Sequence, residues 1–168
     1  MNTMNKKDTF IARRGATLIL KMTLFVMSAI VLLLAIFALP NMWKGGSAEF
    51  PEASDAIFLI MLGLYATTIP FFITLWQTFK LLGYIDNNKV FSDLSARALK
   101  NIKHCAIVIG ILYMGGVPLL LPIAEADDAP GLLVIGFIIA CIPIVIAVFA
   151  EVLERILQST LEIKSKND

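Results

Sequence analysis

Four long stretches of the chain contain no Asp, Glu, Lys or Arg, and this pattern constrains the fold more than any other feature. They are residues 22–39, 56–79, 105–124 and 129–150. About 20 apolar residues of helix cross the hydrocarbon core of a bilayer. The stretches do not alternate between polar and apolar residues as the strands of a membrane barrel do. Since backbone groups in lipid must bond within their own segment, helices are the remaining spanning element.

The predicted fold class is therefore all-α, an integral membrane four-transmembrane-helix bundle. Composition agrees, because 58% of the residues are hydrophobic and only 16% are charged, where about a quarter charged is usual for a soluble domain. We predict a single membrane domain, 1–168. A cytoplasmic loop at 80–104 connects its second and third spans, and a cytoplasmic tail at 151–168 follows the fourth. Its transmembrane helices are expected at about 16–39, 56–79, 105–124 and 129–150.

A cleaved signal peptide is the alternative for the first helix. However, its apolar stretch is longer than the usual signal core of about 7–15 residues. The sequence that follows, PNMWKGGSAEF, lacks the small-residue pattern of a cleavage site. We therefore expect this segment to remain as a spanning helix.

Basic residues predict the orientation. In a four-span protein the N-terminal arm, the central loop and the tail share one side, and only Lys44 falls on the other. The three regions hold 13 of the 14 Lys and Arg residues: Lys6, Lys7, Arg13, Arg14, Lys21, Lys80, Lys89, Arg97, Lys100, Lys103, Arg155, Lys164 and Lys166. Because basic loops stay in the cytoplasm, both termini are predicted to be cytoplasmic in a multi-pass protein of the cell membrane.

Amphipathic helical extensions are expected on the cytoplasmic side. Ser92 is a plausible N-cap, and apolar residues recur at helical spacing after it and again along the tail. These apolar residues either pack against one another or dock a partner protein, and the sequence leaves both open. The candidate docking residues are Leu94, Leu99, Ile102, Ile156, Leu157 and Leu161.

Small and hydroxyl-bearing residues form stripes within the second and fourth spans. Such stripes let helices approach closely and exchange hydrogen bonds in lipid, although a pore or substrate groove is an alternative. The candidate packing residues are Gly63, Thr67, Pro70, Thr74, Gly136 and Ala140. In the third span, Gly115, Gly116, Pro118 and Pro122 predict a bent or irregular outer half.

No pattern in the sequence indicates chemistry. His104 is the single histidine, and no third ligand stands near it and Cys105. Phosphate loops, metalloprotease motifs and nucleophile elbows are not found. We expect no enzymatic activity, no catalytic residue, no metal and no cofactor. The net charge of +1 gives no reason to expect direct binding of nucleic acid.

Several stretches resemble the YoaS-like family of uncharacterised bacterial inner-membrane proteins. They are FPEAS, LGLYATTIPFF, YIDNNKVFSDLSARALKNIKHCAI, AEADDAPG, IVIAVFAEVL and the tail, and the resemblance covers nearly the whole chain. The resemblance implies a plasma membrane protein of the Gram-positive type. It also implies a regulatory partnership, because members are often encoded beside a small helix-turn-helix regulator. It brings no activity and no functional residues.

Our leading hypothesis is a non-enzymatic membrane component that docks a cytoplasmic partner such as that regulator. One alternative is a small transporter or channel subunit. Another is a defence or sensing protein whose acidic outer loops meet cationic peptides, through Glu49, Glu52, Asp55, Glu125, Asp127 and Asp128. The lipid bilayer is a partner in every case, and a second copy of the chain stays open as another.

The orientation can be tested by labelling introduced cysteines in intact cells. We expect cysteines at Ser47 and Asp128 to react with an impermeant thiol reagent added outside, and one at Asn87 to stay unreacted. The reason is that the basic loops hold residue 87 inside. Reaction at Asn87 would overturn the whole assignment of sides.

Overall fold

The computed structural model describes residues 6–87 and 89–167, and these residues contain helices and no strand. Four continuous helical stretches are long and apolar enough to cross a membrane: Gly15–Glu49, Pro51–Asp86, Asp93–Ala126 and Gly131–Lys166. The predicted fold class is confirmed. The ends of the predicted domain, residues 1–5 and 168, and position 88 of the predicted loop lie outside the described residues.

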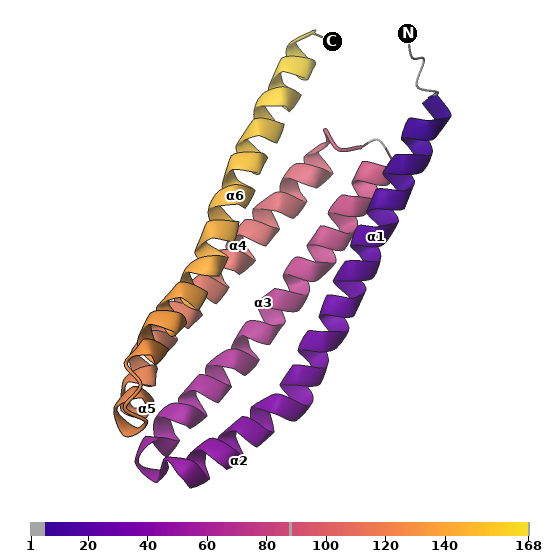
Figure 1. Cartoon of the computed structure of the whole chain (residues 1–168). Helices are drawn as coiled ribbons and strands as arrows, with labels where there is room; N and C mark the ends of the chain where they lie inside the picture. Colours follow the sequence, from indigo (N-terminus) through magenta and orange to yellow (C-terminus); the bar gives the residue numbers. More distant parts are fainter. Residues whose placement is uncertain (1–5, 88, 168) are drawn as a thin grey trace.

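The spans pack in a row rather than around a common centre (Figure 1). Helix α1 (Lys6–Leu33) lies against α3 (Ser54–Asp86), α3 against α4 (Asp93–Gly116), and α4 against α6 (Gly131–Asn167). The beginning of α1 and the end of α6 lie at the same end of the molecule. We refer to this end as the terminal end and to the opposite one as the turn end.

The first span is longer than expected and contains a wide turn. A π-helical segment, Leu34–Ala38, follows α1, and α2 (Leu39–Glu49) continues the helix past residue 39, where the first transmembrane helix was expected to end. Pro40 has no N–H and its ring clashes with the carbonyl four residues earlier. The wide turn accommodates this, and the amide of Leu39 bonds the carbonyl of Leu34. Beyond the wide turn, α2 bends toward the beginning of α3 (Figure 1).

The loop between α3 and α4 is shorter than predicted, because α3 runs on to Asp86. Ser92 is the N-cap of α4, as expected, and its hydroxyl accepts from the amide of Ser95. Both serine hydroxyls also donate to the carbonyl of Lys89, at 2.7 Å from Ser92 and 3.1 Å from Ser95. Ser95 is buried, so these bonds fix the path by which the chain enters α4.

The half of the third span nearer the turn end is irregular, as its prolines predicted. A 3-10 segment, η3 (Val117–Leu120), interrupts the helix before the short α5 (Leu121–Ala126). A tight turn then leads into α6, and Asp128 in it has a positive φ of 49°. A second 3-10 segment, η2 (Pro51–Ala53), lies beside α5 at the turn end.

Helices α4 and α6 share the most extensive helix–helix contact among the described residues. The buried side chains of α6 recur every three or four residues along the face toward α4: Ala140, Pro143, Ala147, Ala150, Glu154 and Leu157. On α4, a Cβ atom at Gly110 would lie 2.9 Å from Cγ1 of Ile144, so glycine is needed for this approach. Small residues at such contacts let helix backbones come together in lipid.

Leucine substitutions on α6 test this packing. Ala140 is 1% exposed, and a Cβ atom at Gly136 would overlap the side chain of Leu120. We expect Gly136→Leu and Ala140→Leu each to destabilise the fold by about 1–3 kcal/mol, the usual cost of overpacking. Ile138→Leu should be tolerated because Ile138 is 58% exposed. Thermal unfolding in detergent measures this, and equal tolerance at all three positions would contradict the interface.

Candidate functional site

A cluster of charged side chains joins α4 and α6 at the terminal end. Nζ of Lys103 lies 2.5 Å from Oε2 of Glu151 and 2.8 Å from Oε2 of Glu154. Arg155 holds the other oxygen of Glu151 at 2.7 Å, and the amide of Gln158 donates to Glu154. Lys103 and Glu151 flank the uncharged stretches 105–124 and 129–150 of the last two spans.

The partners of Lys103 could have been found in the sequence. The turn between the last two spans centres near Asp127, and Lys103 lies as far before it as Glu151 lies after it, 24 residues each way (127 − 103 and 151 − 127). In an antiparallel helix hairpin with a tight turn, residues at equal distance from the turn face one another. Only four residues separate the uncharged stretches 105–124 and 129–150, so the short turn between them carries the signal.

A second ion pair connects α1 to α3 at the same end. Nζ of Lys21 lies 2.6 Å from Oδ2 of Asp86 and 5.6 Å from the centre of the Phe79 ring. The sequence analysis counted Lys21 among the basic residues of the N-terminal arm but did not identify its partner. The pair ties α1 to the end of α3.

The candidate docking residues separate into two groups. Leu99, Ile102 and Leu157 are buried, and Leu157 forms a small core with Ala96 and Leu99, on which Leu161 packs. Leu94 and Ile156 are exposed, at 49% and 58%. The tail therefore packs partly on its own chain, which was one of the two readings left open, and a second side of it stays uncovered.

The candidate packing residues also lie in different surroundings. Thr67 is buried, yet its hydroxyl donates to the carbonyl of Leu64 in its own helix, and Thr74 donates to Pro70 in the same way. These hydroxyls therefore bond within α3 rather than across to another helix. Gly63 has no atom within 4 Å of the position where a Cβ would stand.

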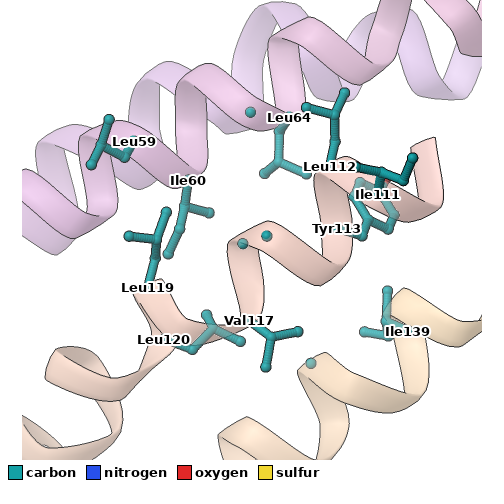
Figure 2. A pocket seen from close by; sticks show the side chains of 14 residues that line it. Leu59, Ile60, Leu64, Ile111, Leu112, Tyr113, Val117, Leu119, Leu120 and Ile139 are labelled. Atoms are coloured by element: carbon teal, nitrogen blue, oxygen red, sulfur yellow. The ribbon is translucent and has the colours of Figure 1, made fainter. Parts of the chain in front are cut away.

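Gly63 instead lines an apolar cavity of about 460 Å³ between α3, α4 with η3, and α6. Figure 2 shows Leu59, Ile60 and Leu64 on one wall and Val117 and Ile139 on the facing side. Gly115, Gly116 and Gly136 also lie on its lining, so the space exists because several positions lack side chains. An apolar molecule could occupy the cavity, but its lining contains no charged group that would orient such a molecule.

The described residues contain no group of three or more His, Cys, Asp or Glu side chains that could hold a metal. His104 lies on the exposed side of α4, where its Nδ1 is 2.7 Å from the carbonyl of Lys100. The charged cluster around Lys103, in which three ion pairs join four side chains, is therefore the main polar site between α4 and α6.

Removing Lys103 tests what the cluster does for stability. Glu154 is buried, and without Lys103 its charge lacks its main partner. Breaking a buried pair by removing one partner is strongly destabilising, so we expect Lys103→Met to lower the unfolding temperature in detergent by several degrees.

Two further variants provide the controls. Arg155→Gln should change the unfolding temperature little, since Arg155 is exposed and such pairs contribute little. Adding Glu154→Gln to Lys103→Met should restore part of the loss. An unfolding temperature unchanged in Lys103→Met would show that the cluster does not hold α4 to α6.

Comparison with known proteins places the chain among uncharacterised membrane proteins. It is 47% identical over 155 residues to the "Uncharacterized membrane protein YoaS" of Bacillus subtilis (strain 168), an alignment that covers 92% of this chain and 97% of that protein. No solved structure matches. The family model described as "Protein of unknown function (DUF2975)" matches residues 41–168. With four membrane-spanning helices and this match over most of its length, the chain belongs to the DUF2975 family of membrane proteins.

Proposed function

We propose that the protein is a non-enzymatic membrane component that docks a cytoplasmic protein on the exposed side of α6. The observation that supports this is a set of apolar side chains beyond the charged cluster, where α6 has left the hydrocarbon region. They are Ile156 and Ile163, with exposed fractions of 58% and 63%. We call them the tail stripe.

The tail stripe is uncovered because α4 occupies a different side of the helix. Leu157 and Leu161 turn toward α4, while Ile156 and Ile163 lie on the opposite side of α6. The last turns of α6 also extend past the start of α4 (Figure 1). Contiguous apolar surface outside a membrane marks an interaction site in soluble surroundings, and an amphipathic helix is a common docking element.

The side of the membrane follows from the basic residues. Nearly all Lys and Arg residues gather at the terminal end, and basic segments stay in the cytoplasm. The partner proposed is therefore a cytoplasmic protein. A helix-turn-helix regulator is the proposed identity, because the family resemblance implies such a neighbour.

Replacing two residues of the tail stripe tests the proposal. We expect Ile156→Ser with Ile163→Ser to lose the partner in an affinity pull-down from detergent, at equal membrane levels of bait. Each side chain contributes about 1.5–3 kcal/mol when buried, and a loss near 3 kcal/mol weakens binding by more than a hundredfold. Leu161 is left intact because it packs within the chain.

Glu162→Ser is the matched control, since it changes an exposed polar residue of the same helix segment. It should recover the partner as the wild type does. Unchanged recovery by the double variant would exclude the tail stripe as the docking surface. Recovery of no partner by any form would instead favour the transport hypothesis.

A further inference from the structure

A groove runs along α4 and α6 from the charged cluster into the hydrocarbon region. Its volume is about 550 Å³, within the range of about 300–1,000 Å³ typical of small-molecule sites. Lys103, Glu151 and Arg155 line one end, and Met114 and Ile144 line the other. The groove is built by these two helices alone and is separate from the cavity of Figure 2, apart from sharing Ile111.

The depth of the groove matches one leaflet of a bilayer. From Lys103 to Met114 on α4, and from Arg155 to Ile144 on α6, the walls are 11 residues long (114 − 103 and 155 − 144). At 1.5 Å per residue each wall measures about 16 Å, and half of a 30 Å hydrocarbon core is about 15 Å. An acyl chain lying in the groove would therefore reach from the membrane surface to the midplane.

Cations stand where a lipid phosphate would lie. Arg155 uses Nε to hold Glu151 and is 77% exposed, which leaves its remaining N–H donors facing outward. Lys100 precedes Lys103 by three residues and so lies on the same side of α4, one turn closer to water. It is exposed, and no ion pair joins it to a carboxylate among the described residues. Lys103 itself is occupied by Glu151 and Glu154.

We propose that this groove binds one anionic phospholipid, with its phosphate held by Arg155 and Lys100 and one acyl chain along Ile107 and Val148. Charge complementarity selects this occupant, since the carboxylates of the cluster are already neutralised by Lys103 and Arg155. The remaining basic group, Lys100, gives the mouth a net positive charge. Both apolar wall residues lie in the groove lining and are otherwise exposed.

Native mass spectrometry of the delipidated full-length protein with added phosphatidylglycerol tests the site. The wild type should retain one lipid per chain at low lipid concentration. Arg155→Gln and Lys100→Gln should each weaken retention about five- to tenfold, and Val148→Trp should abolish it by filling the groove. Lys164→Gln and Val145→Trp are the matched controls, since both positions are exposed on α6 outside the groove lining, and both should retain the lipid.

Two outcomes would overturn the proposal. Equal retention by Val148→Trp and Val145→Trp would show that the groove does not hold the lipid. Equal retention of phosphatidylcholine and phosphatidylglycerol by the wild type would exclude selection by the cations. The unfolding temperature of each variant, measured in the same detergent, identifies any loss that comes from a damaged fold instead.

Discussion

The close approach of α4 and α6 is the contact on which the other features of the structure depend. Between lipid-facing helices there is no hydrophobic driving force, so association relies on packing and on polar contacts. Here Gly110 and Ala140 let the backbones meet, and Lys103 closes the end of the interface with two carboxylates. Because this contact uses one side of α6, it leaves a groove beside it and the tail stripe beyond it.

The first span depends on α3 in a different way. Helix α1 has one helix neighbour in the row, and the first span contacts α3 at several points along its length. Lys21 holds Asp86 at the terminal end, while the hydroxyl of Tyr65 donates to the carbonyl of Ala35 at 2.9 Å further along. Trp43 then meets Phe58 edge to face at the turn end. Between these points, apolar side chains of both helices line open pockets.

The sequence predicted the features that follow from solvation and from backbone chemistry. Uncharged stretches gave the four spans, Pro118 and its neighbours indicated the irregular third span, and Ser92 indicated the start of α4. Each of these depends on residues close together in the chain. Helix ends were less accurate, since α3 and α2 extend beyond the apolar stretches that revealed them.

What was not predicted depends on the register between helices. The position of Lys103 opposite Glu151 follows only once the turn near Asp127 is known to be tight. Whether Leu157 faces its own chain or a partner cannot be read from periodicity, because an apolar stripe has the same spacing in both cases. The row of helices likewise follows from which faces meet, and the spans are apolar on all sides.

The wide turn at Leu34–Ala38 contains one residue more than a regular helical turn would need. In an α-helix each residue rotates the chain by about 100°, so everything after this turn is rotated by that amount relative to an uninterrupted helix. The extra residue therefore determines that Trp43 lies on the side of α2 that faces Phe58. Inserting or deleting one residue within this turn would rotate all of α2 about the helix axis by about 100°. The side chains of α1 would keep their positions against α3.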